Sequence, residues 1–393
     1  MTFQFELIAT DGRARAARLS LHPRESRTPM FMPVGTQGSV KGLTSKQMED
    51  LRCQTVLGNT YHLENRPGSD LMKELGGLHR FNNWSGGTLT DSGGFQMVSL
   101  LDLAEISEDG VTFQSPIDGQ QMMLTPERSI HIQNGIGADI IMALDDVVSS
   151  VHHESSRFEE ATQRTLRWID RCVAAHRRPS EQALFGIIQG GLDQTLRDVC
   201  VEGAARNDNL PGYAVGGLAG GEEKDAFCRV VAQCTASLPD DKPRYVMGVE
   251  STRVVVCVYY SVCSALGADM FDCVYPSRTA RFGTALIPEG VLRLKTAAMA
   301  SDYRPIDSEC DCMVCMQYSR AHLHAKITKE PNAASLLTYH NIRYQMRLCE
   351  QMHQEIVDNQ FGQFVGRFIR RRFPEGHVPP WVRDALSLAG ISL

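Results

Sequence analysis

Residues Leu184–Gly191 read LFGIIQGG, an apolar run that ends in a glutamine and two glycines. Seven further runs of this kind end in glycine, polar or acidic residues: Met30–Thr36, Gln54–Thr60, Thr88–Asp91, Asp139–Asp146, Gly212–Gly217, Arg244–Val249 and Asp269–Val274. The stretches between the runs are long enough for helices, and this alternation is typical of parallel strands joined by crossover helices. Eight such units predict an α/β fold, a closed (β/α)8 TIM barrel.

The active site of such a barrel lies at the C-terminal ends of its strands. In this chain those ends carry three acidic residues, Asp91, Asp145 and Asp272. A single aspartate at such a place often caps the next helix, but three aspartates around one barrel mouth favour a catalytic role. Two carboxylates facing each other can act as nucleophile and acid/base in a displacement at a sugar C1′.

Neutral groups beside these carboxylates fit the recognition of a flat heterocycle. Gln189 and the backbone of Gly217 offer hydrogen-bond groups that can read the edge of a purine-like base. Phe95 and Met247 offer faces on which a ring can stack, although Met247 taken alone is better explained as a core residue. The strand ends therefore predict a base pocket next to reactive carboxylates.

The composition indicates an intracellular protein. With 393 residues and 42% hydrophobic content, the chain can bury a large core, and one barrel with a small appendage accounts for its length. No run reaches the ~20 apolar residues of a membrane span. The N-terminus MTFQFELIATDG has neither signal-peptide nor transit-peptide character. Most of the twelve cysteines lie in apolar runs, which favours reduced thiols and a cytoplasmic location.

The charge distribution limits where a nucleic acid can bind. The net charge of −6 argues against a protein that coats nucleic acid over its whole surface, but it leaves room for a local basic groove. Arg278 and Arg281 directly follow the last predicted strand, at the barrel mouth, and suit phosphate contacts. We interpret the second cluster, near the C-terminus, as a solvated helix face: Arg367, Arg370, Arg371 and Arg372.

One domain boundary is expected, near residue 300. It separates a barrel (residues 1–300) from a zinc-binding, α-rich subdomain (residues 301–393). No low-complexity tract or linker divides the first ~300 residues, the length expected of a decorated barrel. The periodicity predicts helices over Glu289–Met299, Ala333–Val357 and Trp381–Ala389.

A tight cysteine cluster lies at the start of this subdomain. Cys310, Cys312 and Cys315 can all point at one centre from a single loop. Three thiolates need a fourth ligand to complete a tetrahedral site. The candidates are His322, His324 and His340, and the spacing does not choose among them. A Cys3His set without a vacancy is the pattern of one structural zinc ion rather than a catalytic one.

The chain as a whole resembles the tRNA-guanine transglycosylases, of the eukaryotic catalytic type, almost from end to end. The matching motifs are FMPVGT (Phe31–Thr36), GNTYHL (Gly58–Leu63), TDSGGFQ (Thr90–Gln96), IIQGG (Ile187–Gly191), VGGL (Val215–Leu218), MFDCV (Met270–Val274), RTAR (Arg278–Arg281) and the set Cys310, Cys312, Cys315 and His340. The last match implies that His340 is the fourth zinc ligand.

The resemblance implies that guanine at the wobble position of tRNAs with GUN anticodons (Asp, Asn, His and Tyr) is exchanged for queuine. Asp272 is expected to be the nucleophile that forms a covalent tRNA intermediate, and Asp91 the acid/base. Two displacements at C1′ give net retention. The wobble base must leave its stack, which an anticodon loop makes easy.

The resemblance also implies residues around the base and the RNA. The base pocket is expected to consist of Asp91, Ser92, Gly93, Gly94, Phe95, Asp145, Gln189, Gly217, Leu218, Gly220 and Met247. The RNA contacts are expected from Gly248, Val249, Ser277, Arg278, Thr279, Ala280 and Arg281. Val147 and Gly220 stand where bacterial relatives, which use a smaller precursor, have Cys and Val, and this favours queuine.

One segment departs from the family pattern. Residues 250–263 read ESTRVVVCVYYSVC, a few residues too many, with a near-repeat of the Val-Cys element. The departure puts RNA contact by this loop in doubt, and it keeps a second hypothesis open, a non-catalytic RNA-binding subunit of the same family. A third hypothesis, a zinc-dependent barrel hydrolase, requires histidine ligands at the strand ends, where this chain has Asp, Gln and Gly.

The resemblance further implies a partner. The eukaryotic catalytic subunit pairs with a homologous inactive subunit, so we expect a heterodimer, in the cytoplasm or peripherally attached to an organelle outer membrane.

Overall fold

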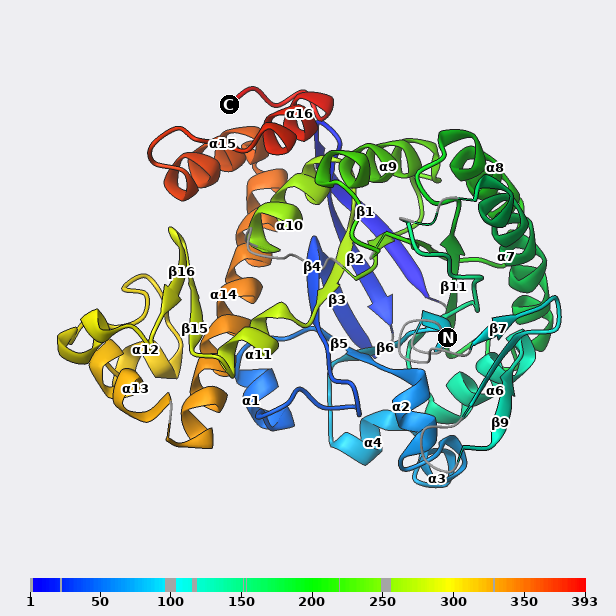
Figure 1. Ribbon diagram of the computed structural model, residues 1–393, viewed down its shortest axis with the longest axis horizontal. Helices are drawn as coiled ribbons and strands as arrows, with labels where there is room; N and C mark the ends of the chain where they lie inside the picture. Colours follow the sequence, from blue (N-terminus) through cyan, green and yellow to red (C-terminus); the bar gives the residue numbers. More distant parts are fainter. Residues whose placement is uncertain are drawn as a thin grey trace.

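The computed structural model describes residues 3–21, 23–95, 104–114, 119–150, 152, 154–218, 220–248, 256–327 and 329–393. All eight predicted strand regions are confirmed and form one parallel sheet (Figure 1): β4 (Met30–Pro33), β5 (Thr55–Gly58), β6 (Gly87–Thr90), β10 (Ile140–Met142), β11 (Ala183–Ile188), β12 (Tyr213–Val215), β13 (Arg244–Val246) and β14 (Met270–Cys273). Their order is β4-β14-β13-β12-β11-β10-β6-β5. A parallel bridge between Val34 and Leu57 joins β4 to β5 and closes the barrel.

Alternation along the strands explains the core. Met30 and Met32 of β4 belong to the cluster inside the barrel, whereas Phe31, between them, packs outside against the helices. Such a period of two is what a strand buried on both faces imposes. The inside of the barrel is therefore filled with side chains, and space for a substrate is left at its end.

The N-terminal hairpin sheet closes the opposite end of the barrel. It consists of β1 (Gln4–Asp11), β2 (Ala14–Leu21) and β3 (Arg24–Thr28). Leu19 and Leu21 join the cluster inside the barrel. Arg15 of β2 pairs at 3.3 Å with Asp269, the residue before β14, and both side chains are buried. The mouth at the C-terminal ends of the strands is the end that the hairpin leaves open.

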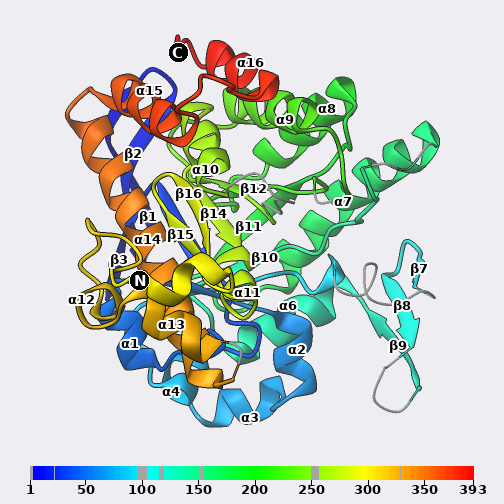
Figure 2. The same ribbon diagram turned by 60° about the vertical axis from the view of Figure 1, so that its left-hand side comes forward.

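Helices surround the barrel in the order of the chain (Figure 1): α1 (Ser45–Asp50), α2 (Thr60–Asn65), α3 (Ser69–Glu74), α4 (Leu78–Asn82), α6 (Pro126–Ile136), α7 (Ser155–Ala175), α8 (Gln194–Ala205), α9 (Lys224–Ser237), α10 (Val256–Ala265) and α11 (Tyr275–Ala280). Between β6 and α6 a second antiparallel sheet is inserted, made of β7 (Glu105–Ile106), β8 (Val111–Gln114) and β9 (Gln121–Leu124). Figure 2 shows this sheet standing out at the side of the barrel.

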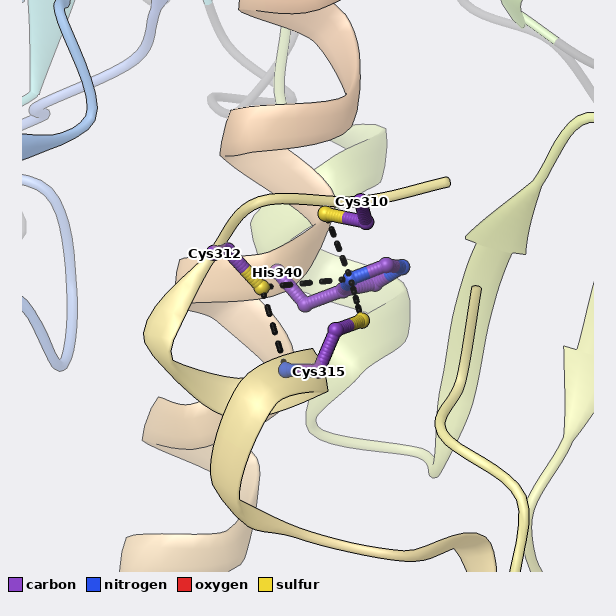
Figure 3. A group of neighbouring side chains, drawn as sticks. All are labelled: Cys310, Cys312, Cys315 and His340. Carbon is purple, nitrogen blue, oxygen red and sulfur yellow. Dashed lines mark hydrogen bonds between the residues drawn. The ribbon is translucent and has the colours of Figure 1, made fainter. Parts of the chain in front are cut away.

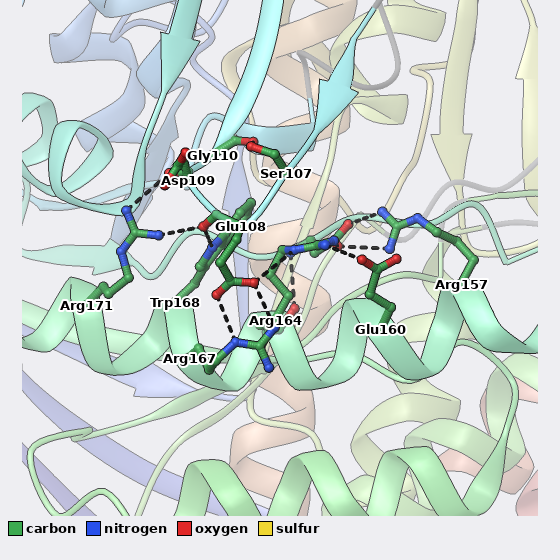
Figure 4. Close-up of polar contacts among 12 residues, drawn as sticks. Ser107, Glu108, Asp109, Gly110, Arg157, Glu160, Arg164, Arg167, Trp168 and Arg171 are labelled. Atoms are coloured by element: carbon green, nitrogen blue, oxygen red, sulfur yellow. Dashed lines mark hydrogen bonds and ion pairs between the residues drawn. The ribbon is translucent and has the colours of Figure 1, made fainter.

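Side chains of α7 hold the turn of the inserted sheet (Figure 4). Arg167 donates to the carboxylate of Glu108 from Nε at 2.8 Å and from Nη2 at 2.7 Å. Trp168 Nε1 and Arg171 Nη1 donate to the carbonyl oxygen of Glu108 at 2.9 and 2.7 Å. The segment that follows the predicted catalytic Asp91 is therefore fastened at its far end to a barrel helix.

The C-terminal part begins with a hairpin instead of the helix predicted over Glu289–Met299, and that prediction is wrong. Strands β15 (Thr284–Ile287) and β16 (Gly290–Arg293) pair in antiparallel fashion, and a 3-10 turn, η1 (Ala297–Ser301), follows. Gly290 has φ +148°, a value that no helix residue adopts, and pairing with β15 satisfies the backbone of β16. Tertiary pairing therefore overrides the local helical pattern.

Helices complete the C-terminal part: α12 (Met313–Gln317), α13 (Arg320–Ile327), α14 (Pro331–Val357), α15 (Phe361–Arg372) and α16 (Pro380–Leu388). The helices predicted over Ala333–Val357 and Trp381–Ala389 are confirmed. Figure 1 shows α14 between the barrel and the lobe of β15, β16, α12 and α13. Because α14 contacts both, the division at residue 300 stays a prediction. None of the described helices is both long and apolar enough to cross a membrane.

The unusual segment 250–263 falls partly within α10, while residues 250–255 lie outside the described part of the chain. Every residue of α10 is buried. Tyr260 stacks on Phe271 of β14 with ring centroids 5.1 Å apart, and Tyr259 stacks on Trp381 of α16 at 4.7 Å. The regular pairing of β14 with β4 and β13 shows an undistorted strand up to Asp272.

Candidate active site

A cavity of about 540 Å³ lies at the C-terminal ends of the strands. Most of the predicted site residues line it: Asp91, Ser92, Phe95, Asp145, Gly217, Leu218, Gly220, Met247, Gly248, Asp272 and Arg278. The three strand-end carboxylates thus surround one space. Val147, His62 and Tyr245 also line the cavity, and the last two were not predicted.

Asp91 follows β6 and is held by donors from the start of α2 and from its own turn after β6. Its Oδ2 accepts from Asn59 Nδ2 at 2.6 Å, and its Oδ1 accepts from the backbone N–H of Thr60 at 2.9 Å and of Gly93 at 3.1 Å. Gly93 has φ +82°, which suits the turn that brings its N–H back to the carboxylate. These contacts fix the carboxylate in one orientation.

Asp272 ends β14, and two donors converge on its Oδ1. The Tyr245 hydroxyl donates at 2.6 Å and the Gly248 N–H at 2.8 Å. Burial, followed by the charge of Asp272, raises the pKa of Tyr245 well above its usual value, so the hydroxyl stays a donor. Sequence reasoning missed Tyr245. The signal available was a tyrosine at an inward position of β13, because a buried hydroxyl needs a partner.

Asp145 follows β10 and is buried, with 5% of its surface exposed. Its Oδ2 accepts from Gln189 Nε2 at 2.7 Å, and its Oδ1 accepts from the Ser92 hydroxyl at 3.2 Å. Burial raises the pKa of Asp145 to about 6. The structure therefore joins the predicted Ser92, Asp145 and Gln189 in one hydrogen-bonded group, with Gln189 supporting the aspartate from beneath the cavity.

The neighbouring Asp146 is turned away from this group. Its side chain is 0% exposed, and it accepts from Arg157 Nη1 at 2.9 Å and from Arg164 Nη1 at 2.6 Å. Two arginines compensate this buried carboxylate, whereas Asp145 has neutral partners. The position in the Asp-Asp pair thus decides which carboxylate faces the cavity.

Glycines allow the walls of the cavity to approach one another closely. A Cβ at Gly217, where φ is +70°, would lie 2.3 Å from Gln189 Oε1. A Cβ at Gly94 would lie 2.9 Å from Leu144 Cδ1, and one at Gly220 would lie 2.7 Å from the backbone nitrogen of Ser150. A valine at 220 would therefore push against the loop that carries Ser150 and change that end of the cavity.

The predicted RNA tract forms α11 directly after β14. Ser277, Arg278, Thr279 and Ala280 belong to this helix and Arg281 caps its end. Arg278 is exposed and lines the cavity, Arg281 is exposed, and Ala280 is buried. Gly248 binds Asp272 through its N–H, and Val249 lies outside the described residues.

The four predicted metal ligands meet in one buried cluster (Figure 3). The ligand atoms of Cys310, Cys312, Cys315 and His340 all lie within 4.8 Å of one another. His340 turns Nδ1 toward the thiols at 3.3 to 3.7 Å and uses Nε2 to contact the carbonyl oxygen of Leu286 at 2.7 Å. The cluster could hold one metal ion.

The two other candidate histidines lie elsewhere. His324 Nδ1 contacts the carbonyl oxygen of Leu294 at 2.7 Å, and the ring of His322 lies 5.0 Å from that of Tyr318. All twelve cysteines are free, as expected for reduced thiols.

Comparisons with known proteins agree with this geometry. The profile of the family described as queuine tRNA-ribosyltransferase matches residues 11–374. The queuine tRNA-ribosyltransferase catalytic subunit of Schizosaccharomyces pombe is 48% identical over 401 residues, which cover 99% of this chain and 98% of that protein. The catalytic subunit of Caenorhabditis elegans is 45% identical, with 99% of each chain covered, and the queuine tRNA-ribosyltransferase of Thermus thermophilus is 48% identical, also with 99% of each covered. The chain therefore belongs to the queuine tRNA-ribosyltransferase family.

Proposed function

We propose that this chain is the catalytic subunit that exchanges the wobble guanine of GUN-anticodon tRNAs for queuine. The tRNA set is that of Asp, Asn, His and Tyr. The names of the S. pombe and C. elegans relatives support the reaction. The observation that carries it is that Asp91, Asp145 and Asp272 surround one cavity of about 540 Å³, large enough for a purine base and part of its ribose.

Asp272 is the proposed nucleophile. A carboxylate oxygen attacks ribose C1′, the bond from C1′ to guanine N9 breaks, and an ester-like bond between C1′ and Asp272 forms. Tyr245 and Gly248 both donate to Oδ1, so they orient the carboxylate before attack. In the second displacement, N9 of queuine attacks C1′ and releases Asp272, which gives net retention.

Asp91 is the proposed acid/base. The departing guanine needs a proton as it leaves, and the incoming queuine must lose the proton on N9. One carboxyl group can give the first proton and take up the second, which returns it to its starting state. The donors from Asn59, Thr60 and Gly93 hold this carboxylate at the edge of the cavity.

The base pocket is proposed to read one edge of the base with Asp145 and Gly217. An ionised Asp145 accepts N–H groups of the base, and the Gly217 N–H donates to its carbonyl oxygen. Phe95 and Met247 supply stacking faces, since both line the cavity. The remaining wall is assigned to Ser92, Leu218 and Gly220, which line the cavity, supported by Gly93, Gly94 and Gln189, which do not line it. Val147 and Gly220 support queuine as the incoming base.

RNA is proposed to lie over α11 and the loop after β13. Arg278 and Arg281 are exposed next to the cavity and suit phosphates on either side of the flipped nucleotide. The tract Ser277–Arg281, with Gly248 and Val249, then positions the anticodon loop.

The Cys3His cluster is proposed to hold one structural Zn²⁺. Three thiolates and one imidazole are the ligand set of closed tetrahedral zinc sites, and burial of all four leaves no open position. Bound zinc would supply cross-linking rather than Lewis-acid chemistry. Asn341, next to His340, donates to the carbonyl oxygens of Pro276 and Thr284 at 3.0 Å, so the cluster supports α11.

The catalytic-subunit names of the eukaryotic relatives support a heterodimer with a homologous, non-catalytic subunit. We place the complex in the cytoplasm, with peripheral attachment to an organelle outer membrane as a further expectation. The boundary at residue 300 separates the barrel from the zinc-binding part in this proposal.

The deciding experiment measures incorporation of labelled guanine and of queuine into a GUN-anticodon tRNA, with the partner subunit present. Wild-type protein should incorporate both bases, and Asp272→Asn should incorporate neither while it still binds tRNA. A tRNA whose wobble guanine is replaced should be inert. Binding of tRNA without incorporation by the wild type would contradict the proposal and favour a non-catalytic RNA-binding subunit.

A further inference from the structure

Arg197 is a buried cation to which the proposed mechanism gives no role. It lies on α8, and its side chain is 0% exposed. Its guanidinium donates to three main-chain carbonyl oxygens: from Nε to Gly191 at 2.9 Å, from Nη1 to Ile188 at 2.7 Å and from Nη2 to Gly216 at 2.9 Å. Arginine keeps its charge in proteins, so this is a buried positive charge placed among peptide dipoles.

The three carbonyl groups belong to the two turns that carry base-recognition residues. Ile188 is the last residue of β11, and its carbonyl shares a peptide unit with the N–H of Gln189. Gly216 follows β12, and its carbonyl shares a peptide unit with the N–H of Gly217. Arg197 therefore binds the back of the Gly216–Gly217 peptide, whose N–H is proposed to face the base pocket. It also holds the Ile188–Gln189 peptide, whose N–H donates to Cys200 Sγ at 3.2 Å.

Close packing leaves these turns little freedom around Arg197. A Cβ at Gly190, where φ is +131°, would lie 2.8 Å from the backbone nitrogen of Arg197. A Cβ at Gly217 would lie 2.3 Å from Gln189 Oε1, and Gln189 in turn donates to Asp145 at 2.7 Å. Contacts thus run without interruption from Arg197 through both turns to Asp145.

We infer that Arg197 is a positioning residue for base recognition, which aligns the turns Gln189–Gly191 and Gly216–Leu218 and polarises the peptide between Gly216 and Gly217. A charged donor on the carbonyl oxygen draws electron density from the peptide, so the Gly217 N–H becomes a stronger donor toward a carbonyl oxygen of the base. The inference rests on the proposed function and assigns to it a residue that does not touch the substrate.

The test compares Arg197→Met and Arg197→Lys with Arg244→Met. Arg244 is a matched control, because it is also a buried arginine that donates to a main-chain carbonyl, that of Leu238 at 2.8 Å, but it lies at the N-terminal start of β13. With the partner subunit present, three quantities are measured: KM and kcat for guanine exchange, the Kd of free guanine by calorimetry, and hydrogen–deuterium exchange over residues 186–191 and 213–218.

We expect Arg197→Met to raise KM and Kd for guanine by roughly 10-fold, with kcat changed by less than about 3-fold and KM for tRNA unchanged. Arg197→Lys keeps the charge but can donate to fewer carbonyl oxygens, so its effect on KM and Kd should be intermediate. If Arg197→Met does not fold, the test rests on Arg197→Lys. Hydrogen exchange should rise over both turns in the Arg197 variants and over neither in Arg244→Met.

Two results would overturn the inference. One is faster hydrogen exchange in the turns with unchanged KM and Kd for guanine, which would make Arg197 merely structural. The other is an equal rise of KM in Arg244→Met. A wild type that binds guanine but does not exchange it contradicts the proposed function alone, because Kd still reports on Arg197. A wild type that binds no guanine contradicts both.

Discussion

The cavity at the barrel mouth and the Cys3His cluster are both built from ionisable side chains that are buried or half-buried, yet they differ in what they enclose. At the mouth, each carboxylate is held by neutral donors, and a cavity of about 540 Å³ remains between them. In the cluster, four ligand atoms lie within 4.8 Å of one another. Space between the polar groups, more than their number, therefore separates a site that admits a substrate from one that holds a single ion.

The backbone explains this difference. The residues of the mouth come from the ends of separate strands, which the barrel holds apart at a fixed spacing. Cys310 and Cys312 precede α12, Cys315 lies within it, and the fourth ligand comes from α14, which packs against α12. Four predictions follow from the contrast, and the first concerns the cluster.

Replacing Cys315 with serine should have the largest effect, because it removes one of four ligands from a closed metal site. Structural zinc sites typically bind their ion with ~10–16 kcal/mol, and one of four ligands accounts for about a quarter of this free energy. We therefore expect metal affinity to fall by roughly 10²-fold or more. Since the cluster supports α11 through Asn341, KM for tRNA should rise more than KM for guanine. Metal content by mass spectrometry and both KM values check this. The control Cys349→Ser changes a buried cysteine of α14 outside the cluster and should leave the metal content unchanged.

Asp145→Asn should raise KM for guanine by about 10²-fold, because a hydrogen bond to a charged group contributes about 1.5–3 kcal/mol. Metal content should stay at the wild-type value, which would separate the mouth from the cluster. Asp269→Asn is the control, since it changes a buried aspartate at the other end of the barrel. An equal rise of KM in both variants would show general damage instead of lost base recognition.

Tyr245→Phe should lower kcat by about 10-fold, with KM for guanine nearly unchanged. The variant removes one of two donors to Asp272 Oδ1 and leaves the Gly248 N–H in place. Steady-state exchange rates test it. Tyr213→Phe, which changes a tyrosine of the neighbouring strand β12, should behave like the wild type, and a loss of kcat there would contradict a specific role for Tyr245.

The last prediction concerns the dependence of stability on pH. Burial raises the pKa of Asp145 to about 6, above the value of 3.8 for an unperturbed aspartate. Because the pKa is raised in the folded state, the contribution of Asp145 to stability is fully present below pH ~3.8 and is lost as the pH rises through ~6. Between pH 4 and 7 the free energy of unfolding of the wild type should therefore fall by up to about 3 kcal/mol relative to that of Asp145→Asn. Urea unfolding of both proteins at several pH values measures this, and a constant difference would contradict it.

The sequence predicted the strands of the barrel well because their signal is local. A run such as LFGIIQGG combines apolar strand residues with a glycine turn, and both features can be read without knowledge of the neighbours. The helix predicted over Glu289–Met299 failed for the opposite reason. Its alternative, the strand β16, depends on pairing with β15 and on the positive φ of Gly290.

By itself the sequence determined the eight strands, the acidic strand ends and the thiol loop, because each depends on residues close together in the chain. Only the tertiary structure decided which residues serve those strand ends: Tyr245 on Asp272, Gln189 on Asp145, the arginine pair on Asp146 and Arg197 behind the two turns. Spacing alone also left three histidines open, and packing of α14 brought His340 to the thiols. Such partners are set by which strands and helices become neighbours, and periodicity along a single chain carries little information about that choice.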